Sequence, residues 1–386
     1  MKNILKSLLL CFLLLSLIFC TLACRQEDPD GAQGAKEIVP IVTYLGTPIA
    51  ERYPEGDIAR CPWDLALHDG GVFMGGGDYD KNKGPVDLWR YDIAKGTFSL
   101  SASIPDEQVD RFCYVFDELA TPGIDPKEDW ELGNYFTYTD GEWVKHRTIP
   151  GGVHVFDIIE FDSILIAGLG VVSGEYPAAY SIDGGESFRQ MPFYKEDALL
   201  DTSYATYVRV YDFFVCGEEL YAYVLLGNQG DLVYELYRYE YDDDAFYYVE
   251  DWTNKLDRVS YRFSKIGANV SFDGTLVFTT GFLYTATEMT NPIKHTIDGV
   301  DLVADLYVAN GRLYALCATK NEDGTFTNAV YTTDSLDAPL TKLFEFSYEI
   351  SAMSFVVEGN DFYVGMGYGR AHEKNGALLH ILLSTK

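Results

Sequence analysis

The sequence predicts an all-β fold, a seven-bladed β-propeller of four-stranded antiparallel blades, from three observations. Apolar residues make up 47% of the chain and charged residues 23%, which excludes disorder and provides for a large core. Tyr (29) and Phe (23) far outnumber Met (6), while 35 Gly and 14 Pro interrupt the chain, which favours strands and tight turns over helices. A strand-turn-strand unit recurs at the interval of one propeller blade.

Each unit begins with a short apolar strand, a turn, and a second strand that reads apolar-aromatic-apolar and ends in small residues. Asp-Gly and Asn-Gly between apolar runs are strong signals for a β-hairpin turn. The turns fall at Asp69-Gly70, Asp117-Glu118, Asp162-Ser163, Gly217-Glu218, Asp273-Gly274, Asn310-Gly311 and Gly359-Asn360. A second hairpin follows, as at 88–92 and 96–98, so we expect four strands per unit.

The last unit lacks a fourth strand near the end of the sequence, because only 354–357, 362–365 and 378–383 have strand character there. The segment 37–44 precedes the first unit and has the composition of a strand. We expect it to close the ring as the outermost strand of the last blade, which would otherwise leave an open sheet edge. Pro40 is tolerated there, since one side of an outermost strand is unpaired.

The first 23 residues are predicted to be a signal peptide. Lys2 and Lys6 precede an apolar run over 8–19 that is too short to span a membrane comfortably. The following Thr21-Leu22-Ala23-Cys24 resembles a bacterial lipobox, which implies acylation of Cys24 after cleavage. Thr21 departs from the usual Leu at its position, so cleavage as a plain secretory protein remains open.

The chain is therefore expected to have three parts: a lipoprotein signal peptide over 1–23, a polar tether over 24–36 and a β-propeller domain over 37–386. This organisation predicts an extracytoplasmic protein of the bacterial cell envelope that touches the membrane only through its lipid anchor.

The formal net charge of −30 excludes a general role in nucleic-acid binding, because phosphate contacts need a basic surface. An extracellular glycan or protein is the expected partner, and the chain is expected to be a monomer. Four cysteines lie within the predicted domain, without metal-binding spacing: Cys61, Cys113, Cys216 and Cys317. Buried free thiols are expected, although disulfides are allowed outside the cytoplasm.

Residues 181–188, Ser-Ile-Asp-Gly-Gly-Glu-Ser-Phe, resemble the Asp-box of sialidase-like propellers, S-x-D-x-G-x-x-[FW]. In this motif the Asp183 side chain is expected to cap backbone N–H groups of a glycine turn, while Phe188 packs on the blade. Weaker relatives occur at 138–143 and 332–335, and residues 87–92 with Phe98 resemble a kelch blade. These resemblances imply a propeller and say nothing about catalysis.

Arg60-Cys61-Pro62 is similar to the aromatic-Arg-Ile-Pro motif that sialidases carry before the first inner hairpin. The resemblance implies an arginine that grips a substrate carboxylate through two parallel hydrogen bonds. Ala59 replaces the aromatic residue, and Asp78-Tyr79-Asp80 replaces the Glu-Gly-Arg expected after the second strand. A surface arginine in an ordinary turn is therefore the alternative.

Basic residues are scarce, and five fall at or just before the first strand of a unit: Arg60, Arg111, His154, Arg209 and Arg262. First strands line the channel of a propeller, so these side chains are predicted to form a positive funnel for an anionic ligand, such as a carboxylated sugar. Pairing with nearby carboxylates is the alternative, and the candidates are Asp64, Asp110, Asp157 and Asp212. Trp130, in a long loop on the same face, would suit sugar stacking or core packing.

Loop 78–87 alternates oxygen-bearing side chains as calcium-binding loops do. The ligands would be Asp78, Asp80, Asn82 and Asp87. Lys81 and Lys83 would compete with a cation, so a solvated acidic loop is the alternative. Calcium is the one cofactor that the sequence suggests.

These patterns favour a binding protein that holds an extracellular glycan or protein on its loop-bearing face. A sialidase-type glycoside hydrolase is the alternative, and position by analogy would make Tyr348 its nucleophile and Asp80 or Asp87 its acid. A purely structural interaction platform is a third interpretation. The sequence contains no H-E-x-x-H, P-loop or G-x-S-x-G motif.

Overall fold

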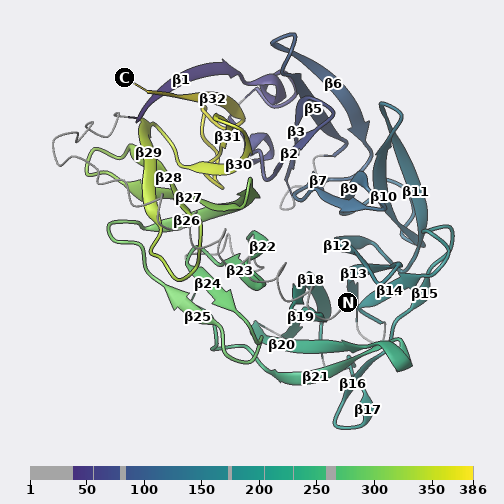
Figure 1. The fold of residues 1–386 in the computed structure, drawn as a ribbon. Helices are drawn as coiled ribbons and strands as arrows, with labels where there is room; N and C mark the ends of the chain where they lie inside the picture. Colours follow the sequence, from purple (N-terminus) through teal and green to yellow (C-terminus); the bar gives the residue numbers. More distant parts are fainter. Residues whose placement is uncertain are drawn as a thin grey trace, which may run out of the picture. The chain divides into compact units, whose positions relative to one another are not determined.

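The computed structural model describes residues 38–54, 56–78, 84–172, 176–203, 205–228, 230–257 and 267–385. Residues 39–384 form one compact unit. Its strands form a propeller-like ring of four-stranded antiparallel sheets, which confirms the all-β prediction (Figure 1). The described residues contain only three short helices, all of the 3-10 type: η1 (Pro48–Glu51), η2 (Ile58–Arg60) and η3 (Tyr241–Asp243).

Five sheets in the described part of the chain are separate and have four strands each. The first contains β2 (Leu65–His68), β3 (Gly71–Met74), β5 (Val86–Asp92) and β6 (Thr97–Ile104). The second contains β8 (Cys113–Val115), β9 (Glu118–Pro122), β10 (Leu132–Thr139) and β11 (Glu142–Pro150). Between these two sheets in the sequence, the short strands β4 (Gly76–Gly77) and β7 (Gln108–Val109) pair with each other.

The other three separate sheets come from the second half of the chain. One contains β22 (Asn269–Phe272), β23 (Thr275–Thr279), β24 (Leu283–Ala286) and β25 (Ile293–His295). The next contains β26 (Leu302–Ala309), β27 (Arg312–Lys320), β28 (Phe326–Thr333) and β29 (Thr341–Tyr348). The last contains β30 (Ala352–Glu358), β31 (Asp361–Met366), β32 (Ala377–Thr385) and β1 (Ile38–Gly46).

The remaining strands form one ten-stranded sheet. Four of them are β12 (His154–Phe161), β13 (Ile164–Val172), β14 (Ala178–Ser181) and β15 (Arg189–Gln190). Four more are β18 (Tyr207–Cys216), β19 (Glu219–Asn228), β20 (Asp231–Glu240) and β21 (Ala245–Asp251). A hairpin of β16 (Phe193–Lys195) and β17 (Ala198–Leu199) completes it, with β16 parallel to β21.

The sequence predicts seven blades, whereas five four-stranded sheets stand apart in the described part of the chain. The reason is the length of β13. Its last residues, from Gly170 to Val172, run beyond its pairing with β14 and pair antiparallel with Tyr207 to Arg209 at the start of β18. Backbone hydrogen bonds thus join two sets of four strands into one sheet.

All seven predicted turns join the first two strands of a set. Asn310 and Gly311 have φ values of 52° and 70°, and Asp69 and Gly70 have values of 47° and 64°. Positive φ at both central residues is the geometry of a type I′ turn, whose twist matches that of the flanking strands. The turn before β9 lies one residue earlier than predicted, at Phe116 and Asp117.

The predicted closing strand is also confirmed. β1 lies beside β32 at the outer edge of the last sheet (Figure 1). Leu45 of β1 packs against a buried cluster that includes Val72 of the first sheet and Leu378 of the last. The strand therefore covers the edge of β32 and contributes to the core where the first and last sheets meet.

Side-chain carboxylates tie neighbouring sets of strands together near the centre of the ring. Asp157 of β12 accepts hydrogen bonds from Ile158 N (3.0 Å) and from Phe213 N on β18 (2.8 Å). Asp305 of β26 accepts hydrogen bonds from Leu306 N (2.8 Å) and Phe355 N on β30 (2.9 Å) in the same way. A β-bulge immediately precedes each of these aspartates and turns it towards the next set.

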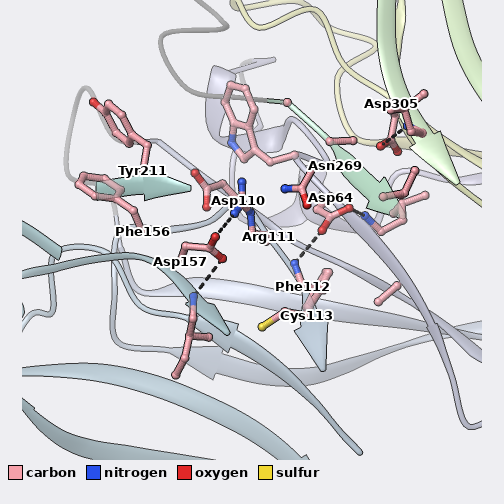
Figure 2. A pocket seen from close by; sticks show the side chains of 18 of the residues that line it. Asp64, Asp110, Arg111, Phe112, Cys113, Phe156, Asp157, Tyr211, Asn269 and Asp305 are labelled. Carbon is pink, nitrogen blue, oxygen red and sulfur yellow. Dashed lines mark hydrogen bonds and ion pairs between the residues drawn. The ribbon is translucent and has the colours of Figure 1, made fainter. Parts of the chain in front are cut away.

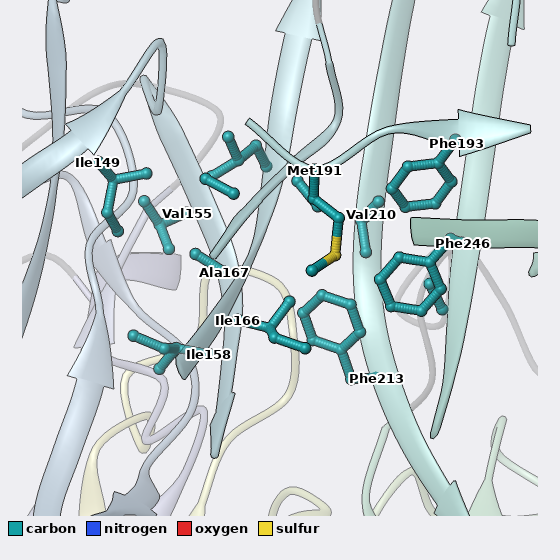
Figure 3. Packing of buried hydrophobic residues seen from close by; sticks show 14 of the residues in the cluster. Ile149, Val155, Ile158, Ile166, Ala167, Met191, Phe193, Val210, Phe213 and Phe246 are labelled. Carbon is teal, nitrogen blue, oxygen red and sulfur yellow. The ribbon is translucent and has the colours of Figure 1, made fainter. Parts of the chain in front are cut away.

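A core cluster fills the space between the sheets on this side of the ring (Figure 3). Phe213 of β18 stacks on Phe246 of β21, with ring centroids 5.8 Å apart. Met191 and Ile166 lie beside these rings. Burying each such side chain contributes about 1.5–3 kcal/mol, so this packing holds the first strands in place around the centre.

The turn between β14 and β15 is organised by Asp183. Its carboxylate accepts hydrogen bonds from Ser187 N (2.9 Å) and Ser181 Oγ (2.7 Å), while Gly185 N donates to Ser181 Oγ (2.8 Å). The hydrogen bonds from Ser187 and Ser181 lower the pKa of Asp183 to about 2. Phe188 is buried with its ring 6.1 Å from that of Tyr135.

Candidate ligand-binding cavity

A cavity of about 720 Å³ lies among the first strands of the sheets. β2, β8, β12, β18, β22, β26 and β30 all contribute to its lining. Figure 2 shows acidic side chains, Arg111 and the rings of Phe156 and Tyr211 around it. Its volume is in the range that suits a small ligand, and its wall combines aromatic surface with a few charged groups.

Arg111 forms the central ion-pair network of this wall. Its Nη1 lies 2.6 Å from Asp157 Oδ2, and its Nη2 pairs with Asp212. Burial disfavours the charged guanidinium, but the two carboxylates outweigh that effect and raise the pKa of Arg111. The structure therefore realises the carboxylate pairing that was the alternative for this residue, and the positive charge of Arg111 is fully compensated.

Asp64, just before β2, joins the first sheet to the second through the same kind of hydrogen bonds as Asp305. Its carboxylate accepts hydrogen bonds from Leu65 N (2.8 Å) and from the N–H of Phe112, the residue before β8 (2.7 Å) (Figure 2). Burial raises the pKa of Asp64 to about 7, although both N–H groups favour its charged form. Its carboxylate, like those of Asp157 and Asp305, is thus committed to holding two backbone segments together.

Arg209 is placed very differently from Arg111. No carboxylate forms an ion pair with it in the described ranges. Its guanidinium carbon lies 4.6 Å from the ring centroid of Tyr207, 5.5 Å from that of Phe156 and 5.8 Å from that of Tyr211. Its Nη1 donates a 2.7 Å hydrogen bond to the Tyr211 hydroxyl. Aromatic faces thus stabilise this cation at the cavity wall.

His154 lies next to the aromatic rings around Arg209 and contacts Asp125, which in turn interacts with Glu107. Its ring stacks on Phe156, with centroids 5.4 Å apart, and its Nδ1 lies 2.8 Å from Asp125 Oδ1. Burial opposes charge on Asp125, but the contact with His154 lowers its pKa. Burial, together with the charge of Asp125 and a hydrogen bond to it, raises the pKa of Glu107 to about 9.

Arg60, the residue of the sialidase-like motif, is not among the residues that line the cavity. It is buried and donates to three backbone carbonyls: Tyr53 O, Pro54 O (3.0 Å) and Glu373 O (3.0 Å). Its guanidinium therefore holds the loop between β31 and β32 against the segment before η2.

Other predicted site residues are also spread over the molecule. Trp130 is 64% exposed in the loop between β9 and β10, where Arg147 pairs with Asp129 at 2.5 Å. Tyr348 ends β29, and Asp87 on β5 lies 3.5 Å from Arg52 Nη1; neither lines the cavity. Four predicted residues lie outside the described residues: Asp80, Asn82, Arg262 and Cys24.

Of the predicted calcium-binding loop 78–87, the structure describes residue 78 and residues 84–87. Asp78 is fully buried, and Asp87 accepts a 2.8 Å hydrogen bond from Ser103 Oγ. Within the described residues, no group of three or more His, Cys, Asp or Glu side chains could hold a metal ion. No disulfide joins the four domain cysteines, all of which lie in the described ranges, and Cys113 lines the cavity.

Two features of the site were not predicted from the sequence, although a signal for them is present. They are the three aromatic rings around Arg209 and the hydrogen bonds by which Asp305 joins β26 to β30. The pattern Val-x-Asp-apolar occurs three times, as Val155–Ile158, Val210–Phe213 and Val303–Leu306. Each copy carries a bulge in a first strand. The residue between Val and Asp is Phe156, Tyr211 or Ala304, and each of these lines the cavity.

Stability is expected to fall as pH rises from about 4 to about 7, because of buried carboxyl groups such as Asp106. Its Oδ1 accepts a 2.8 Å hydrogen bond from Asn134, and burial raises its pKa from 3.8 to about 7. In that window the folded state keeps a proton that the unfolded state has released. Asp106→Asn should flatten the change in urea-unfolding free energy between pH 5 and pH 8.

Asp183→Asn is the matched control for this measurement. The pKa of Asp183 is about 2, so this carboxyl group is ionised in both states throughout the window and the variant should keep the wild-type slope. An unchanged slope in Asp106→Asn would contradict the assignment of the pH dependence to buried acids.

No protein-family model matches the chain, and no curated protein matches it. Solved structures do resemble it. A chain of the mitotic checkpoint complex aligns over 93% of this chain and 96% of its own length, with a TM-score of 0.52 and 11% identity. The computationally designed protein Ika8 aligns over 85% and 98%, with a TM-score of 0.48 and 10% identity. At such identities the likeness concerns the fold alone.

None of the helices in the described ranges has the length and apolar character needed to cross a membrane.

Proposed function

We propose that this chain is a binding protein that takes a small extracellular ligand, such as part of a glycan, into the cavity among its first strands. The observation that carries the proposal is a cavity of about 720 Å³ whose wall is built by every set of strands. The carboxylate of Asp64 accepts hydrogen bonds from backbone N–H groups, and that of Asp157 accepts one from a backbone N–H group and pairs with Arg111. The wall is thereby rigid before a ligand arrives, which reduces the entropic cost of binding.

The proposed setting is the bacterial cell envelope. The lipobox-like Thr21–Cys24 supports a lipid anchor at Cys24, followed by a polar tether over 24–36. The exposed Trp130 belongs to the same loop as Ile124, which lines the cavity. An aromatic face at that position would suit the part of a glycan, or of a protein partner, that extends out of the cavity.

We further propose that the ring has seven blades and is related to sialidase-like and kelch-like propellers. The ten-stranded sheet contains two sets of four successive antiparallel strands, each beginning with a hairpin closed by a two-residue turn. The hydrogen bonds around Asp183 support the Asp-box resemblance. Counting each set as one blade gives the seven predicted from the repeats.

A sialidase-type hydrolase remains the alternative from another class, and the described geometry supports it less well. Tyr348 and Arg60 are not cavity-lining residues, and the donors of Arg60 already bond backbone carbonyls. Turnover of a fluorogenic sialoside by the purified protein would overturn the binding-only proposal.

The proposal predicts that filling the cavity abolishes ligand binding. Ile159 faces the cavity, so Ile159→Trp should remove the rise in melting temperature that a ligand from a panel of monosaccharides, uronic acids and short peptides causes in the wild type. Ile182→Trp is the control, because Ile182 is 61% exposed and does not line the cavity. A ligand-induced shift that survives in Ile159→Trp would place binding outside the cavity, and a panel without any hit would contradict the proposal.

A further inference from the structure

We propose that Arg209 is the receptor for a carboxylate group of the ligand. This inference rests on the proposed function and names the chemical class of the ligand. Arg209 lines the cavity, and its one side-chain hydrogen bond among the described residues is donated by Nη1 to the Tyr211 hydroxyl. A guanidinium carries five N–H donors in a planar fork, so the geometry leaves donors for a bidentate contact with a carboxylate.

The contrast with the other arginines isolates Arg209. Arg111 lines the same cavity, but Asp157 and Asp212 neutralise it. Arg60 donates to three backbone carbonyls away from the cavity. Among the described cavity-lining residues, Arg209 is therefore the cation whose charge is not matched by a carboxylate in contact with it.

The strand geometry explains how an unpaired cation can be held there. Tyr207 and Arg209 lie two residues apart on β18, so their side chains share one side of the strand. Tyr211 belongs to the β-bulge between Val210 and Asp212, and its ring centroid lies 5.8 Å from the Arg209 guanidinium carbon. Phe156 comes from β12 and packs on Tyr211, with ring centroids 4.7 Å apart (Figure 2). The ring faces supply a favourable electrostatic environment without consuming N–H donors.

Two glycines make room for these rings. A Cβ on Gly227 of β19 would lie 2.2 Å from the Tyr207 ring. A Cβ on Gly170, the residue opposite Arg209 on β13, would lie 2.6 Å from the Phe156 ring and 2.9 Å from His154. The backbones of β13 and β19, the two strands that pair with β18, thus contact the rings of Phe156 and Tyr207 directly, and a side chain at either glycine would displace these rings.

The surroundings favour a singly charged ligand group over a doubly charged one. Asp64, Asp110, Asp157 and Asp305 also line the cavity, and the whole chain carries a net charge of −30. Such a field opposes a phosphate dianion more strongly than a carboxylate. The nearby Asp125 contacts His154 and Glu107, and its charge also interacts with that of Arg209, but it forms no ion pair with the guanidinium in the described ranges.

The test compares D-glucuronate with D-glucose, which differ by one carboxylate, using ligand-observed NMR and calorimetry. The wild type should bind glucuronate at least about tenfold more tightly than glucose, because a charge-assisted bidentate contact is available to glucuronate alone. Arg209→Gln should abolish this preference, and Arg209→Lys should reduce it, because an ammonium lacks the fork. Arg189→Gln, which removes an exposed arginine on β15, should keep it.

Tyr211→Phe gives a second and milder variant, because it removes only the hydroxyl that orients Nη1 and keeps the ring. It should weaken glucuronate binding several-fold and leave glucose binding unchanged. The inference is overturned if Arg209→Gln binds glucuronate like the wild type, if glucose binds equally well, or if inorganic phosphate competes as strongly as glucuronate. Equal binding of both sugars that is lost in Ile159→Trp would overturn the role of Arg209 alone, whereas no binding of either would overturn the proposed function as well.

Discussion

Replacing Arg111 with methionine is expected to lower the free energy of unfolding by about 3–5 kcal/mol, because it leaves two buried carboxylates without their cation. Asp157 and Asp212 have side-chain exposures of 7% and 0%, and both contact the guanidinium of Arg111. Methionine fills a similar volume, so the loss would report the missing charge rather than a cavity. Urea unfolding at pH 7, followed by tryptophan fluorescence, measures the effect.

A second substitution separates charge from packing in this network. Asp212→Asn combined with Arg111→Met removes one of the two orphaned charges, so the double variant should be more stable than Arg111→Met alone. Arg189→Met, on the exposed strand β15, is the control and should change stability by less than about 0.5 kcal/mol. A wild-type unfolding midpoint for Arg111→Met would show that the ion pairs contribute nothing to the fold.

Removing β1 is expected to destabilise the fold by at least about 3 kcal/mol and to cause self-association. The deletion exposes the edge of β32 and removes Leu45 from the cluster that joins the first and last sheets. Each lost backbone hydrogen bond costs about 0.5–1.5 kcal/mol and the buried leucine about 1.5–3 kcal/mol. An uncovered apolar edge is also a template for pairing with another chain.

The measurement compares a chain that begins at residue 37 with one that begins at residue 47, so that only β1 and the residue before it differ. Light scattering after gel filtration and thermal unfolding should show a stable monomer for the first chain and aggregation with a lower melting temperature for the second. Equal melting temperatures and equal masses would show that β1 does not close the ring.

The hairpin turns and the closing strand were predictable because their signals are local. Asn310-Gly311 specifies a type I′ turn through its own backbone preferences, and 37–44 is a strand-like segment next to a unit that lacks one. The joining of two strand sets was not predictable in this way. It depends on how far β13 continues past Gly168, which a run of apolar and small residues does not determine.

The candidate site was predictable only as a list of basic residues. Arg111 lies just before the first strand β8 and Arg209 lies on the first strand β18, and the structure places both at the cavity. Their different environments arise from partners remote in sequence, since Arg111 and Asp212 are 101 residues apart. Arg60 was selected by a local motif, yet its contacts include Glu373, 313 residues away. Composition and spacing carry no information about such pairs.

The pairing of β13 with β18 has a consequence for how firmly the backbone of Arg209 is held. Three consecutive residue pairs join β13 to β18, whereas an isolated bridge between Gly281 and Val303 joins the sheets of β23 and β26. Arg209 belongs to the longer ladder, opposite Gly170, so main-chain hydrogen bonds as well as core packing fix the position of its backbone. We therefore expect its guanidinium to approach a ligand from a fixed anchor.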